Sequence, residues 1–104
     1  MYDSKSRIDK AKKIRSVLED YLGKKNLDEL RVMDIGCSTG IIDDYLSNFF
    51  KSLTGIDIDN KAIEYSKRNF EKTNLKFEIG DGLNLKFNDN SFDLVICTQT
   101  YEHV

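Results

Sequence analysis

The spacing of apolar side chains changes along the chain and divides it into short segments. From Ser4 to Leu22 apolar residues recur every three or four positions, which is the period of an amphipathic helix, and Gly23 stands where that helix would end. Four short apolar runs follow, each typical of a strand, and they cover residues 30–35, 52–57, 75–79 and 92–97. Between the first three of these runs helical spacing returns, at about 39–49 and about 60–72.

Strands that alternate with helices predict an α/β fold. Parallel strands joined by helices form right-handed crossovers, so we expect a parallel sheet of about four strands with helices on both faces. Numbered along the chain, the strands should lie in the order 3-2-1-4. We expect Asp59 to cap the helix that begins at Asn60. The pattern divides the chain into an N-terminal amphipathic helix over residues 1–25 and an α/β domain over residues 26–104.

Three aspartates stand at the carboxyl ends of the predicted strands. Asp34 ends the first strand, Asp57 the second, and Asp81 follows the third. In an open parallel sheet, ligands bind outside these strand ends, beside the place where the strand order reverses. Three carboxylates around one crevice disfavour an anionic ligand and favour a cationic ligand with hydroxyl groups.

The loop after the first strand carries two glycines in the spacing Gly36-x-Ser38-x-Gly40. A dinucleotide-binding turn has a third glycine where Ile41 stands here, because the pyrophosphate needs that close approach of the backbone. An NAD(P)-dependent reductase therefore remains only as an alternative.

Composition and charge narrow the possible partners and the cellular location of the protein. Residues 1–25 carry eight basic and four acidic side chains, and because the two signs are interleaved we expect a solvated helix face and no nucleic-acid partner. No signal peptide opens the chain, and no apolar run is long enough to cross a bilayer, so we expect a cytoplasmic protein without membrane insertion. Cys37 and Cys97 lack metal-site spacing and are expected to be reduced thiols.

Four segments, in order, resemble the motifs of the class I S-adenosylmethionine-dependent methyltransferases, in the small-molecule branch related to quinone-biosynthesis enzymes. The segments are "VMDIGCSTG", "LTGIDID", "FEIGDGLNLKF" and "FDLVICTQTYEHV". The resemblance implies a Rossmann-like fold, S-adenosylmethionine as the cofactor and S-adenosylhomocysteine as its product. It also implies that this chain is the cofactor-binding half, truncated relative to the seven-stranded sheet of the family, with little or no turnover alone.

The resemblance assigns five residues to the methionine part of the cofactor. The backbone at Gly36, Cys37 and Gly40 would approach the ligand, Asp34 would lie near its amino group, and Thr98 would lie under the sulfonium.

Five further residues are assigned to the adenosine part. Asp57 would accept hydrogen bonds from both ribose hydroxyls, and Ile58 would pack on the adenine ring. Asp81 would accept from the adenine amino group, with backbone contacts from Gly82 and Leu83.

The acceptor side is less defined. His103 is the only histidine and is a candidate general base, with a role in capping or anchoring the next helix as its alternative. The chain has no proline, so it lacks the Asn/Asp-Pro-Pro-Tyr/Phe loop that family members acting on exocyclic or amide nitrogens often use, and we expect a small-molecule acceptor. No metal site is expected. A non-catalytic binding or scaffold module stays an alternative, as does self-association through the open edge of the fourth strand.

Overall fold

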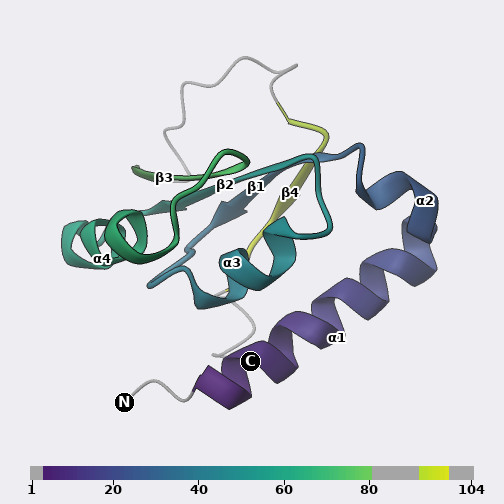
Figure 1. Cartoon of the computed structure of the whole chain (residues 1–104), viewed down its shortest axis with the longest axis horizontal. Coiled ribbons are helices and arrows are strands. Elements are labelled where there is room, and N and C mark those ends of the chain that lie inside the picture. Colours follow the sequence, from purple (N-terminus) through teal and green to yellow (C-terminus); the bar gives the residue numbers. More distant parts are fainter. Residues whose placement is uncertain (1–3, 81–91, 99–104) are drawn as a thin grey trace.

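The computed structural model describes residues 4–80 and 92–98, which form one α/β unit (Figure 1). Its helices are α1 (Ser4–Leu22), α2 (Lys24–Leu27), α3 (Ile41–Ser47) and α4 (Asn60–Phe70). Its strands are β1 (Arg31–Ile35), β2 (Ser52–Asp57), β3 (Leu75–Ile79) and β4 (Leu94–Ile96). The predicted elements are all present, although α3 and β4 are shorter than expected, and the single turn of α2 was not predicted. None of the described helices is long and apolar enough to span a membrane.

The four strands form one parallel sheet in the order β3-β2-β1-β4, which confirms the predicted order. β1 lies in the middle, so that Met33 is level with Thr54 of β2 on one side and with Val95 of β4 on the other. The chain therefore reverses its direction across the sheet between β3 and β4, and the carboxyl ends of β1 and β4 lie side by side at that reversal.

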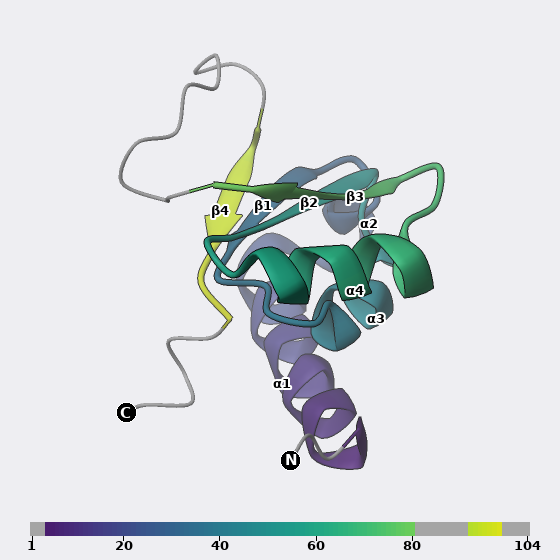
Figure 2. The same cartoon turned by 90° about the vertical axis from the view of Figure 1, so that its left-hand side faces the viewer.

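Within residues 4–80 and 92–98 the helices cover one face of the sheet, whereas helices on both faces were predicted. Figures 1 and 2 show α1, α3 and α4 on the same face. The reason is topological: β1 to β2 and β2 to β3 step in the same direction across the sheet, and right-handed crossovers in one direction place their helices on one side. A helix on the other face requires a crossover in the opposite direction, and the chain first reverses between β3 and β4.

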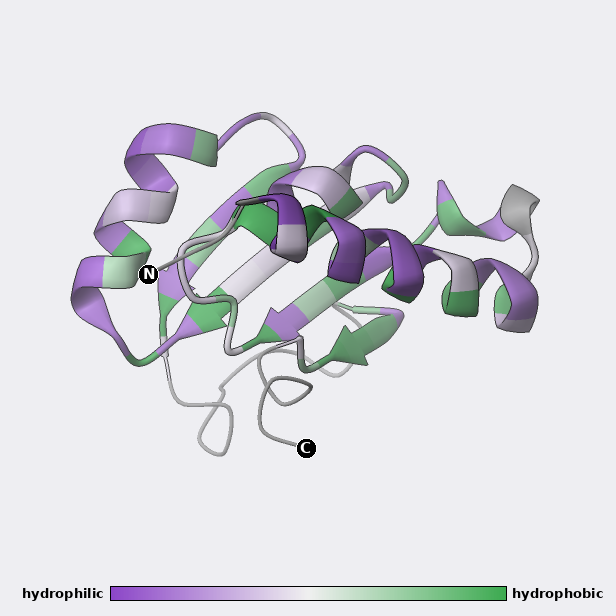
Figure 3. Ribbon diagram, turned by 90° about the horizontal axis from the view of Figure 1, so that it is seen from below, coloured by the Kyte–Doolittle hydropathy of each residue, from purple (hydrophilic) through white to green (hydrophobic). Residues whose placement is uncertain are grey.

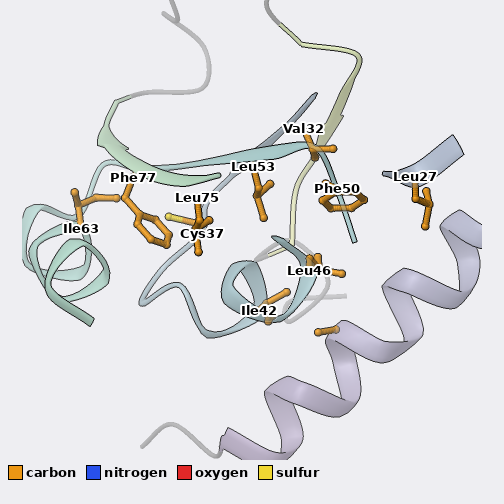
Figure 4. Close-up of a cluster of buried hydrophobic side chains, with 11 residues drawn as sticks. Leu27, Val32, Cys37, Ile42, Leu46, Phe50, Leu53, Ile63, Leu75 and Phe77 are labelled. Carbon is orange, nitrogen blue, oxygen red and sulfur yellow. The ribbon is translucent and has the colours of Figure 1, made fainter. Parts of the chain in front are cut away.

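The hydrophobic core lies between the sheet and these helices (Figure 4). Val32, Leu53, Leu75 and Phe77 from the strands are all almost fully buried, and they meet side chains from the helices, such as Leu46. Helix α1 belongs to the same core, with Ala11 fully buried and Ile14, Leu18 and Leu22 packed against it. In Figure 3 hydrophobic positions recur among hydrophilic ones along this helix, as its sequence period predicts.

Candidate functional site

The loop that follows β1 turns sharply and is attached to β2. Gly36, Ser38 and Gly40 all have positive φ, at 81°, 55° and 85°. The backbone N–H groups of Gly36 and Cys37 both donate to the carbonyl oxygen of Ile56, at 2.7 and 3.1 Å. Glycine adopts two of these left-handed conformations without strain. Ser38 is held in its left-handed conformation by contacts with two neighbouring elements.

One of those neighbours is the carboxylate of Asp57, at the carboxyl end of β2. Its Oδ2 accepts from the backbone N–H of Ser38 at 2.8 Å, and its Oδ1 accepts from the backbone N–H of Asp59 at 2.9 Å. The residue is only 8% exposed. Each carboxylate oxygen has about two acceptor positions, so the described residues occupy one on each oxygen and leave one on each.

The second neighbour of the loop is Ser66, on helix α4. Its buried hydroxyl lies 3.1 Å from the carbonyl oxygen of Ser38 and 2.9 Å from that of Ala62, so it joins the loop to the helix. A Cβ added at Gly40 would lie 2.9 Å from Phe77 Cζ and 3.0 Å from Ser66 Oγ. Gly40 is therefore required by the space available as well as by its φ angle.

A buried polar link joins the ends of β1 and β4. Asp34 is fully buried; its Oδ1 accepts from the backbone N–H of Thr98 at 3.0 Å and its Oδ2 from the Thr98 hydroxyl at 2.7 Å. Burial raises the pKa of Asp34, although the hydrogen bonds from Thr98 oppose the rise. This link holds Thr98 at the end of β1, from which the glycine loop begins.

The structure brings together the residues predicted on β1, β2 and the end of β4. Ile58, beside Asp57, is an apolar side chain left 74% exposed at this edge. Cys37 is buried, and burial raises the pKa of its thiol, which keeps it protonated. Asp81, Gly82, Leu83 and His103 lie outside the described residues, so their roles stay predictions.

Three residues that shape the site were not singled out from the sequence. Asp43 and Ser66 lie in helices, where a polar residue normally faces solvent, and both are fully buried here. Gly55 lies in the middle of β2, and a Cβ there would lie 2.5 Å from Asp43 Oδ2 and 2.9 Å from Cys37 Cβ. A glycine inside a strand often marks a place where another part of the protein packs closely. Gly55 was therefore the sequence feature from which this close packing could have been predicted. Among residues 4–80 and 92–98, no group of His, Cys, Asp and Glu side chains is arranged to hold a metal ion.

Among the described residues, the site thus combines a glycine loop, a carboxylate with acceptor positions left over and an exposed apolar side chain at the carboxyl edge of the sheet, beside the reversal of the strand order. Residues 33–104 match the family model described as a methyltransferase domain, and the chain belongs to this family.

Similar proteins agree with this assignment. The chain is 30% identical to the malonyl-[acyl-carrier protein] O-methyltransferase of Acetivibrio thermocellus over 97% of its own length, and 31% identical to a ubiquinone biosynthesis O-methyltransferase of Pelagibacter ubique over 96%. It covers 35% and 40% of those two proteins. A solved S-adenosylmethionine-dependent methyltransferase of Methanosarcina mazei aligns with a TM-score of 0.61 and 28% identity, over 76% of this chain and 39% of that one. The predicted family is confirmed, and S-adenosylmethionine is the cofactor that it supports.

Proposed function

We propose that this chain is the cofactor-binding half of an S-adenosylmethionine-dependent methyltransferase that acts on a small-molecule acceptor. The chain spans about 35–40% of the length of the curated relatives compared with it, which supports its being one part of a longer enzyme. The remaining part would complete the acceptor pocket.

The observation that carries the proposal is the environment of Asp57. Its two remaining acceptor positions match the two hydroxyl groups of a ribose, and its low exposure keeps water from competing for them. Hydrogen bonds to a charged group are worth about 1.5–3 kcal/mol each. The neighbouring Ile58 offers an exposed apolar surface to the adenine ring.

The methionine part of the cofactor would lie along the glycine loop, towards Thr98. Asp34 would act there mainly by fixing Thr98, to which both its oxygens are already bonded. The bound cofactor supplies an electrophilic methyl group on a positively charged sulfur. The chain's own contribution is to position that group and to keep water away from it, effects that are worth roughly 7–11 kcal/mol in well-oriented reactions.

The acceptor is proposed from the relatives and from the sequence. Both curated relatives are named as O-methyltransferases, which favours oxygen as the reacting atom. If the acceptor oxygen is a hydroxyl, it must lose a proton during transfer, and His103 is our candidate base.

We also place the protein in the cytoplasm. Cys37 and Cys97 are both free thiols, one buried and one exposed, as a reducing compartment keeps them.

The test is calorimetric titration of the chain with S-adenosylhomocysteine. Asp57→Asn keeps the size of the side chain but removes its charge, so we expect the dissociation constant to rise about 10- to 100-fold. Asp59→Asn is the matched control, because it removes the neighbouring carboxylate while asparagine still caps α4; its affinity should stay within about threefold of the parent chain.

Circular dichroism establishes that both variants are folded, and NADH serves as the competing ligand. Preference for NADH over S-adenosylhomocysteine would support the reductase alternative instead. Equal losses in the two variants would show that Asp57 has no special part in binding.

A further inference from the structure

Asp43 is a buried carboxylic acid that the proposed cofactor contacts do not use. It lies in the first turn of α3 and is fully buried. Within the described part of the chain, neither of its oxygens has an N–H or O–H donor, although both are shielded from water. An ionised carboxylate in such a place would lose its hydration and gain nothing in return.

The groups that face Asp43 are themselves acidic or neutral. From β1, Asp34 is fully buried and level with Gly55 of β2, where an added Cβ would lie 2.5 Å from Asp43 Oδ2, and it is the charged group that acts on the pKa of Asp43. From the loop and β2, Cys37 and Asp57 belong to the same electrostatic cluster. Gly55 presents only backbone to the carboxylate. No basic side chain among the described residues contributes to the pKa of Asp43.

Two neighbouring carboxyl groups that are both buried are most stable when they share one proton, because two like charges repel in a site without water. Thr98 donates twice to Asp34, which stabilises the charged form of that residue. The proton therefore belongs mainly on Asp43, which is then the donor.

We propose that Asp43 is a positioning residue of the cofactor site: as a neutral carboxylic acid it donates to the Asp34 carboxylate, which holds Thr98 in place. The chain of bonds joins α3, β1 and the end of β4 directly behind the glycine loop. That Asp43 and Asp34 share a proton does not depend on any ligand. The effect of Asp43 on cofactor binding rests on the proposed function.

A retained proton makes stability depend on pH. Burial and the charge of Asp34 raise the pKa of Asp43 well above its ordinary value. The folded state then holds a proton that the unfolded chain releases above about pH 4, so stability falls as the pH rises towards the raised pKa of the folded pair. For one proton, the unfolding equilibrium constant rises about tenfold per pH unit.

The first experiment compares the parent chain with Asp43→Asn by carbon-13 NMR of the side-chain carboxyl groups and by urea unfolding between pH 5 and pH 8. One carboxyl signal should keep its protonated shift at pH 7 and be missing in Asp43→Asn. The unfolding constant of the parent chain should rise about tenfold more per pH unit than that of the variant. Asp44→Asn is the matched control: its side chain is 42% exposed and 3.6 Å from Lys72, and the pH slope should stay that of the parent.

The second experiment measures binding of S-adenosylhomocysteine at pH 7. Asp43→Asn retains a donor for Asp34, so its affinity should stay within about threefold of the parent chain. Asp43→Leu, checked for folding, has no donor and should bind at least about tenfold more weakly.

The outcomes separate the two proposals. If the Asp43 carboxyl titrates normally and the chain still binds S-adenosylhomocysteine, the proposed role of Asp43 is wrong and the cofactor site is unaffected. If the Asp43 carboxyl stays protonated but the chain does not bind S-adenosylhomocysteine, the proposed cofactor site is wrong and the shared proton is still supported.

Discussion

Gly55 lies at the point where β2 passes the buried carboxylate of Asp43. A methyl group there would be 2.5 Å from Asp43 Oδ2 and 2.9 Å from Phe77 Cδ1, well inside normal contact distances. We expect Gly55→Ala to lower the free energy of unfolding by about 1–3 kcal/mol, because the surrounding core must shift to accept it. Urea unfolding monitored by circular dichroism measures the change.

Ser52→Ala is the control for that experiment. It lies in the same strand but is only half-buried, and should change the free energy of unfolding by less than about 0.5 kcal/mol. A Gly55→Ala chain as stable as the parent would show that the carboxylate of Asp43 does not occupy this space.

At the scale of elements, the short strand β4 is attached to β1 at both of its ends. At its start the guanidinium of Arg31 lies 3.2 Å from a carboxylate oxygen of Asp93, and the backbone N–H of Arg31 donates to the same oxygen at 2.9 Å. At its end Asp34 holds Thr98. With only three residues in the strand, these side-chain bonds carry much of its attachment.

We expect Asp93→Ala to loosen β4 without loosening the rest of the sheet. Hydrogen exchange should become faster at the amides of β4 and stay unchanged in β2 and β3, because only the bonds at the start of β4 are lost. Asp44→Ala removes another exposed ion pair and serves as the control. Uniform acceleration over the whole sheet would contradict a local attachment.

The stabilising effect of the contact between Asp93 and Arg31 also depends on pH. The hydrogen bonds from Arg31 hold the pKa of Asp93 below its ordinary value. A lowered folded pKa means that the contribution is present above the ordinary carboxyl pKa of about 4 and is lost as the pH falls through the lowered value. The contrast between parent chain and Asp93→Ala should therefore be full at pH 7 and vanish in acid.

In the described molecule as a whole, β4 is an edge of the sheet, and Val95 on it is 52% exposed. An open edge with an apolar side chain favours pairing with a second copy. We expect the chain to sediment as a concentration-dependent mixture of monomer and dimer, and Val95→Lys to shift it to monomer. Analytical ultracentrifugation measures both.

The control for self-association is Tyr21→Lys on α1. Tyr21 is 87% exposed, so the substitution adds the same charge to an apolar surface position on another element. If Tyr21→Lys dissociates the dimer to the same extent as Val95→Lys, the dimer contact does not involve β4. A parent chain that stays monomeric at all concentrations would contradict the prediction outright.

The elements and the glycine loop were predictable because each depends on local spacing in the sequence, and a parallel sheet was predictable because strands alternate with helices. The period of α1, the cap at Asp59 and the run of β2 all appear as predicted. The position of Asp57 was predictable because the end of a strand is a local feature, and parallel strands bring such ends to one edge; its contact with the cofactor stays a prediction.

The tertiary structure alone decided which polar residues are buried and which face of the sheet carries the helices. Asp43 and Asp44 are neighbours of the same type in one helical turn, yet packing buries the first against Asp34 and leaves the second beside Lys72. The helices share one face because successive crossovers step in one direction, whereas the sequence pattern was compatible with both faces. Local sequence determines where elements begin and end, but burial and shared protons depend on residues that are far apart along the chain.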